Sequence, residues 1–242
     1  MNTRRRPFMT RKRTIAAVVG AAAVVGAALF HAPLLRGIVR SLVAEQPSSD
    51  CDGICLISNL QSPEGDRCYD IAAKLWRENP AAPALIVEPP ENRIVAAGGL
   101  PSFAAISRRE LSIRGLPDNA VSILPSDGND DWAIARSLND WLLKHPESVA
   151  VVLCDEFHSG RLRAAIDETL GSARAKQVRI APLPDRRFNR GDWWKTRVGA
   201  RTVGMEWIML LRHWLCGREP CPLPAAAGDY EKNMIESWGE GP

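Results

Sequence analysis

The chain has 242 residues, 45% of them hydrophobic and 24% charged, and a formal net charge of +3 at neutral pH. This length predicts one domain of ordinary size with additional segments. The net charge is small, and the densest group of basic residues lies in the first thirteen positions rather than in the body of the chain, which argues against nucleic acid as a partner.

The amino-terminal segment combines a basic block with an apolar run. Residues 1–13 contain six basic side chains and no acidic one, and residues 15–30 follow without a polar side chain. Extended through Leu35, the run has roughly the 20 residues that a helix needs to cross a bilayer. We therefore predict a transmembrane anchor at residues 14–35, with residues 1–13 in the cytoplasm and the rest outside the bacterial inner membrane. A cleaved signal peptide is the alternative, but no clear cleavage site follows the run.

Beyond the anchor, short strands and helices alternate. Residues 36–50 are predicted to be a connector, 51–217 one α/β domain, and 218–242 a disordered tail. Apolar runs predict strands at residues 53–58, 84–87, 121–124, 149–154 and 178–181. Helical spacing predicts helices over residues 67–78, 102–113, 132–142, 162–170 and 204–215, with 92–100 as a short extra strand or a loop. This order predicts a Rossmann-like parallel sheet of about five strands with helices on both faces.

Six cysteines occur in the chain. Cys216 and Cys221 flank a short loop and are close enough to form a disulfide, which an oxidising compartment favours. Cys154 lies within a predicted core strand and is expected to be a buried free thiol. Cys51, Cys55 and Cys68 are either paired, free or, as an alternative, zinc ligands.

Polar residues follow the predicted strands and should lie at one edge of the sheet. In a doubly wound sheet this edge is where ligands bind. His158 is a candidate general acid or base, oriented by Asp155 or Glu156. Arg161, in the first turn of the next helix, is suited to an anionic ligand. The alternatives are a turn whose carboxylates cap that helix, an arginine paired with Glu156, and a metal site.

A basic and aromatic patch spans residues 186–197. Its Trp193 and Arg197 are candidates for holding an anionic or sugar-bearing ligand by stacking and charge. A position at a membrane interface, or one tryptophan in the core, are the alternatives. The chain has neither a glycine-rich phosphate loop nor a nucleophile elbow, so we expect no nucleotide cofactor, and no cofactor or metal is assigned.

Over about residues 52–215 the chain resembles the YdcF/SanA/ElyC-like family. Residues 126–133, SDGNDDWA, are similar to the family's S-x-N-T-x-E-N-A, and residues 158–161, HSGR, to its H-M-x-R-A. Further similarity lies at Arg67 with Ala72 and Leu75, at Arg109 with Leu111 and Gly115-Leu-Pro117, and in the final helix near Glu206. The resemblance implies a domain that works in cell-envelope biogenesis, on peptidoglycan, surface polysaccharide or their lipid-linked precursors.

The chain also departs from the family. Family members commonly carry glycines after the first strand and S-G-G after the second, where this chain has Ser58-Asn-Leu and Glu88-Pro-Pro. If the family's site uses those loops, the departures imply lost activity or an altered ligand.

Two functional hypotheses follow. In the first, Arg161 and Arg67 hold a phosphate or other anion while His158, aided by Asp155, moves a proton. The further candidate ligand-binding residues are Ser126, Asp127, Glu88, Trp193 and Arg197. In the second, the domain is a non-catalytic scaffold or binding subunit of a polysaccharide-assembly complex. The sequence does not decide whether the protein is an enzyme.

Overall fold

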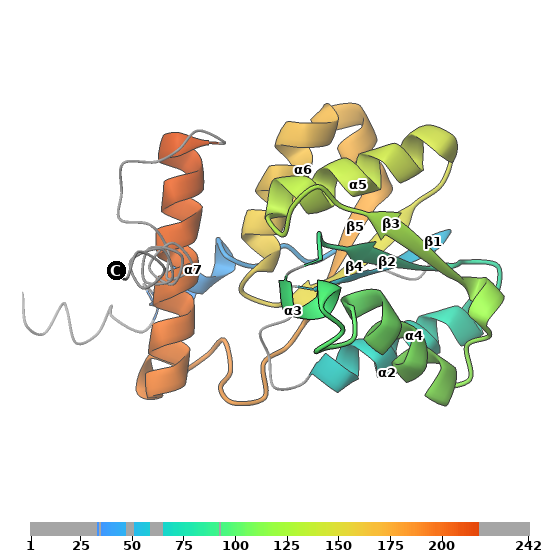
Figure 1. Ribbon diagram of the computed structural model, residues 1–242. Coiled ribbons are helices and arrows are strands. Elements are labelled where there is room, and N and C mark those ends of the chain that lie inside the picture. Colours follow the sequence, from blue (N-terminus) through green and yellow to red (C-terminus); the bar gives the residue numbers. More distant parts are fainter. Residues whose placement is uncertain (1–32, 34, 47–50, 59–64, 92, 218–242) are drawn as a thin grey trace, which may run out of the picture.

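The computed structural model describes residues 33, 35–46, 51–58, 65–91 and 93–217 (Figure 1). Most of the predicted anchor at 14–35 and the whole of the tail at 218–242 lie outside these residues. Among the helices formed by the described residues, none combines the length and the apolar character that a bilayer span requires.

The centre of the domain is a parallel sheet of five strands, in the order β3-β2-β1-β4-β5. The strands are β1 (Gly53–Ile57), β2 (Ala84–Glu88), β3 (Val121–Pro125), β4 (Ala150–Asp155) and β5 (Val178–Leu183). All of β1, and all but the last residue of β2 and β4, are buried, which explains their continuous apolar sequences. The predicted α/β sheet is confirmed, and its order places the topological switch point between β1 and β4.

Helices cover both faces of the sheet, as predicted (Figure 1). Helices α2 (Gly65–Glu78) and α4 (Phe103–Ile113) pack on one face, where Tyr69, Ala72 and Leu111 share a core with Ile54 and Leu56. Helices α5 (Asp131–Lys144) and α6 (Ser159–Arg174) pack on the other face, in a second core that contains Leu138, Leu142, Leu162 and Ile166.

Local capping signals fix several helix ends. The Ser102 hydroxyl accepts a hydrogen bond from the Ala105 amide at 3.2 Å and begins α4. The Asp130 carboxylate accepts one from the Ala133 amide at 2.7 Å and begins α5. Gly115 follows α4 with a φ of +91°, a conformation that glycine adopts without strain.

Two predictions of secondary structure were wrong. Within the predicted segment 92–100, the described residues 93–100 form neither a strand nor only a loop, because Arg93–Ala96 makes one exposed helical turn, α3. The last helix, α7 (Arg197–Cys216), begins well before residue 204 because the Thr196 hydroxyl accepts a hydrogen bond from the Gly199 amide at 3.0 Å. Short 3-10 turns at Asp118–Ala120, Ala175–Gln177 and Trp193–Lys195 precede β3, β5 and α7.

Residues 35–46, predicted to belong to the end of the anchor and a connector, are packed against the domain. Val39 and Leu42 are buried in a third core that also contains Trp193 and Val203. The Leu42 carbonyl accepts a hydrogen bond from the Gly160 amide at 2.8 Å. The Gln46 amide donates to Ile180 of β5 at 3.1 Å, so this segment also runs beside the sheet edge. The folded domain therefore includes this segment.

Cys51, Cys55, Cys68 and Cys154 are all buried, and Cys154 is a free thiol, as predicted. Burial raises the pKa of the Cys55 thiol, which disfavours the reactive thiolate. No three histidine, cysteine or acidic residues of the described ranges are grouped to hold a metal, so the zinc alternative has no support there. Cys216 is disulfide-bonded, and Cys221 lies outside the described residues.

The close approach of residues 35–46 to α6 can be tested at Gly160. A Cβ atom there would lie 2.6 Å from the Leu42 carbonyl oxygen, whereas one at Gly204 in α7 would meet nothing within 4 Å. We expect Gly160→Ala to lower the free energy of unfolding by about 1–3 kcal/mol through overpacking. Gly204→Ala should be neutral or stabilising, by up to about 1 kcal/mol. Denaturant unfolding of both variants measures this, and equal effects would show that the contact at Leu42 is unimportant.

Candidate functional site

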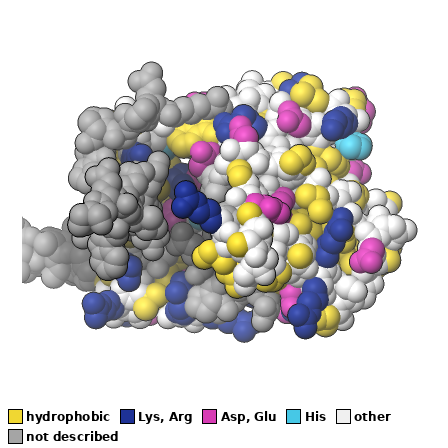
Figure 2. All heavy atoms as spheres, viewed as in Figure 1, with side chains coloured by type: hydrophobic (Ala, Val, Ile, Leu, Met, Phe, Trp, Pro, Cys, Tyr) yellow, Lys and Arg dark blue, Asp and Glu magenta, His cyan; other side chains and the backbone are white. Residues whose placement is uncertain are grey.

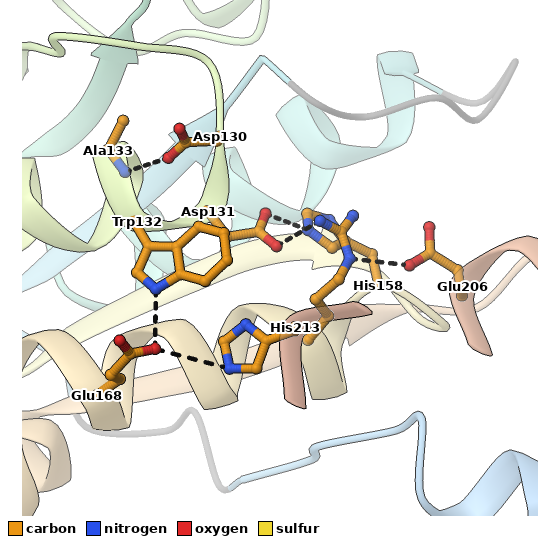
Figure 3. A network of polar contacts seen from close by, with 9 residues as sticks. Asp130, Asp131, Trp132, Ala133, His158, Glu168, Glu206 and His213 are labelled. Atoms are coloured by element: carbon orange, nitrogen blue, oxygen red, sulfur yellow. Dashed lines mark hydrogen bonds and ion pairs between the residues drawn. The ribbon is translucent and has the colours of Figure 1, made fainter. Parts of the chain in front are cut away.

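A buried carboxylate at the start of α5 joins two basic side chains at the start of α6. Asp131 Oδ1 lies 2.6 Å from His158 Nε2, and Asp131 Oδ2 lies 2.6 Å from an Arg161 guanidinium nitrogen (Figure 3). The two helices begin at the carboxyl ends of β3 and β4 and pack side by side on one face of the sheet. Their first turns therefore meet beside the switch point between β1 and β4.

Asp131, His158 and Arg161 form what we call the Asp131 cluster, and a second set of contacts joins α7 to it. Glu206 of α7 accepts a hydrogen bond from Arg161 Nε at 3.3 Å. The Trp132 indole N–H donates to Glu168 at 2.9 Å, and the Trp132 ring stacks on His213 of α7 with centroids 4.9 Å apart (Figure 3). The cluster therefore connects the consecutive helices α5 and α6 to the last helix, α7.

The electrostatics of Asp131 follow from its two partners. Burial favours the neutral acid and raises the pKa, but the charge and hydrogen bond of His158, followed by the charges of Arg161 and His213, outweigh burial. The pKa of Asp131 therefore lies below its ordinary value, and the side chain is a buried carboxylate at neutral pH. Such an anion is tolerated inside a protein only when it is paired and hydrogen-bonded.

This arrangement has the chemical parts of a proton-transfer site. A carboxylate that binds one nitrogen of an imidazole fixes the orientation of the ring and stabilises its protonated form. Only 5% of the His158 side chain and 18% of the Arg161 side chain are exposed. A ligand that contacts the imidazole therefore requires neighbouring side chains to move.

The structure brings His158 and Arg161 together as predicted, but both bind Asp131 rather than the acidic partners that the sequence suggested. Asp155, the predicted partner of His158, is the last residue of β4, paired in register with Leu183, while the imidazole faces α5. Glu156, the alternative partner of Arg161, is buried and binds Arg190, which also binds Glu45 at 3.2 Å.

Four other predicted ligand-binding residues make local contacts away from the cluster. Arg67 donates to the Pro184 carbonyl at 3.1 Å, and the Ser126 hydroxyl donates to the Gly128 carbonyl at 2.8 Å. Asp127 pairs with Arg136 at 2.7 Å. Glu88 accepts a hydrogen bond from the backbone amide of Ala104, in the first turn of α4. None of these four contacts involves Asp131, His158 or Arg161.

The two predicted residues of the basic and aromatic patch are separated by their environments. Trp193 is buried, and its indole N–H donates to the Leu35 carbonyl at 3.2 Å, so the alternative of a core tryptophan fits its position. Arg197 is exposed at the first position of α7. Trp193 therefore does not present its ring to a ligand at the surface.

The sequence analysis missed two of the side chains that meet here, Asp131 and Glu206. Asp131 is not among the candidate residues that the sequence indicated, although it directly follows Asp130, the cap of α5. When residues 126–133 are counted along S-x-N-T-x-E-N-A, however, Asp131 takes the position of the glutamate. Glu206 marks the final helix in the family resemblance, but nothing in the sequence indicated its contact with Arg161, from which 45 residues separate it.

Comparison of the chain with protein-family models, with curated proteins and with solved structures found no match. The similarity to the YdcF/SanA/ElyC-like family therefore stays a prediction.

Described residues line a shallow pocket of about 200 Å³ at the opposite edge of the sheet. Its walls are Trp76, Pro80, Ala81, Pro83, Pro117, Asn119 and Ala120. These residues precede β2 and β3, so this pocket is separate from the Asp131 cluster.

The buried ion pairs can be tested with Asp131→Asn and, as a matched control, Asp127→Asn. Removing one partner of a buried pair costs about 3–5 kcal/mol of unfolding free energy, which we expect for Asp131→Asn. The Asp127 side chain is 65% exposed, so its replacement should change stability little. Denaturant unfolding at neutral pH compares the two, and similar small losses would contradict the structural importance of Asp131.

Comparison of wild type with Asp131→Asn also tests how the stability of the protein depends on pH. Because the pKa of Asp131 is lowered on folding, its contribution to stability is complete above the ordinary value of 3.8 and is lost as the pH falls through the folded-state pKa. The difference in unfolding free energy between wild type and Asp131→Asn should therefore stay constant down to about pH 5 and shrink below it. A constant difference down to acid unfolding would contradict the lowered pKa.

Proposed function

We propose that this protein is a membrane-anchored protein of bacterial envelope biogenesis whose α/β domain lies outside the cytoplasm. Its ligand is a glycan or a lipid-linked, phosphate-bearing precursor of peptidoglycan or exopolysaccharide metabolism. Support for the location comes from the basic block at residues 1–13 and the apolar run at 15–30. Support for the ligand class comes from the resemblance carried by residues 126–133 and 158–161.

The observation that carries the proposal is the Asp131 carboxylate, which holds both His158 and Arg161 at the carboxyl edge of the sheet. The three side chains come from two separate segments of the sequence, each of which resembles a motif of the same family. A shared site would bring these motif positions together in space. Ligands of open α/β sheets bind at this edge, beside the switch point.

In the proposed mechanism, His158 transfers a proton and Asp131 orients the imidazole, in place of the predicted Asp155. Arg161 supplies positive charge for an anionic group. Its contact with Glu206, at 3.3 Å, is longer than its contact with Asp131, at 2.6 Å. A phosphate would therefore displace Glu206 more readily than Asp131.

A specific observation also favours a second candidate function, a non-catalytic scaffold or binding subunit of a polysaccharide-assembly complex. The Asp131 cluster is largely buried, and its contacts join α5, α6 and α7, as expected of a purely structural network. The changed glycine positions at Ser58 and Glu88 point the same way. Scaffolding requires the folded domain but no proton transfer.

The two candidates are separated by His158→Gln, with His145→Gln as the matched control. A glutamine amide can still donate to Asp131 but cannot act as an acid or base at neutral pH. His145 lies at the opposite end of α5, beside Trp141. Each variant should be produced in a native-host strain that lacks the gene, and envelope integrity and exopolysaccharide yield measured, with protein level and thermal unfolding as controls for folding.

We expect the folded His158→Gln variant to behave like the deletion strain and His145→Gln to behave like wild type. Full function of His158→Gln would exclude the catalytic version and leave the scaffold. Mass spectrometry of material that co-purifies with the detergent-solubilised chain tests the ligand class independently. Absence of any glycan or polyprenyl phosphate would speak against both forms of the proposed ligand.

A further inference from the structure

Helix α7 lies outside the layers of the domain and buries only part of its surface. It stands at one side of the sheet and its covering helices, as Figure 1 shows. Its buried residues are Gly199, Val203, Leu210 and His213. At 100° per residue these positions form one stripe of the helix, which faces the domain.

The outward face of α7 is apolar in its second half. The side chains that define this face, and that are between 45% and 67% exposed, are Met205, Ile208, Leu211 and Leu215. Single exposed apolar side chains are common on soluble proteins, but a contiguous group on one helix marks a surface that contacts something else. The described part of the chain leaves this group uncovered.

The charge on the same helix is basic. Arg197, Arg201 and Arg212 lie on the outward side by helical spacing, and the single acidic residue of α7, Glu206, points inward to Arg161. These arginines are interspersed with the apolar side chains on the same exposed face, on a helix not apolar enough to span a bilayer. Such a face suits the headgroup layer of an anionic membrane, where arginine can reach lipid phosphates while its apolar neighbours face the acyl boundary. The charge pattern therefore favours an anionic surface over a neutral or basic partner.

The path of the chain gives an independent reason for a membrane at this place. Residues 35–46 pack against α7, where the Trp207 indole N–H donates to the Ile38 carbonyl at 3.2 Å. The apolar run of residues 15–30 ends only five residues before Leu35. Five residues span at most about 18 Å, so a bilayer crossed by this run would lie next to α7.

We propose that the outward face of α7 lies in the headgroup layer of an anionic phospholipid bilayer, with Ile208 near its centre. This contact is separate from the anchor, and it fixes the orientation of the domain on the membrane. The inference rests in part on the anchor of the proposed function. The experiment below distinguishes failure of the anchor from failure of the α7 contact.

The test is a spin label at Ile208→Cys in the full chain, incorporated into nanodiscs of phosphatidylcholine with phosphatidylglycerol. Leu143→Cys in α5 is the matched control, because Leu143 is 57% exposed and Ile208 is 58% exposed. Wild type treated with the same reagent gives the background from native thiols. The measurement is the accessibility of the label to oxygen, which concentrates in lipid, and to a water-soluble nickel chelate.

We expect the oxygen-to-nickel accessibility ratio at residue 208 to exceed that at residue 143 severalfold. The ratio at 208 should fall in phosphatidylcholine alone, and the double variant Arg201→Gln, Arg212→Gln should lose most of this dependence on phosphatidylglycerol. A label at 208 as accessible to nickel as the label at 143 would overturn the α7 contact while leaving the anchor. Low accessibility to both reagents would overturn it in favour of a protein contact, and a chain absent from the nanodiscs would overturn both proposals.

Discussion

The buried carboxylate of Asp131 is the constraint on which the packing of α5, α6 and α7 depends. A charge removed from water is stable only if oppositely charged donors surround it, so its two oxygens require His158 and Arg161 at hydrogen-bonding distance. This requirement fixes the first turns of α5 and α6 against each other. Through Glu206 it also fixes the rotation of α7 about its own axis.

Residues 35–46 contact the same region of the domain. Leu42 and Ala44 contact the first turn of α6, and Gln46 joins the edge of β5. Glycine is required at residue 160 because the Leu42 carbonyl approaches too closely for a Cβ atom.

Acidic and basic side chains are interspersed on the face of the molecule displayed in Figure 2, without a large region of one sign.

The candidate site and the proposed membrane face lie on opposite sides of one helix. Glu206 and His213 point from α7 into the cluster, while Met205 and Ile208 point away from it. In the proposed arrangement, a lipid-linked ligand and the domain share one membrane surface, and α7 separates the lipid from the buried ion pairs. Both the catalytic and the scaffold candidates are compatible with this geometry, since each needs the domain held at a defined orientation.

The sequence by itself determined the sheet, the layers and several helix ends. Strand periodicity, helix spacing and caps such as Ser102 are local patterns, set by neighbours a few residues apart. It also indicated His158 and Arg161, since both follow a core strand. Only the tertiary structure decided that Asp131, rather than Asp155, binds the imidazole, that Glu206 binds Arg161, and that Trp193 and Leu42 are core residues. Those partners are 27 residues or more apart in the sequence, and helix packing rather than local pattern determines which side chains meet.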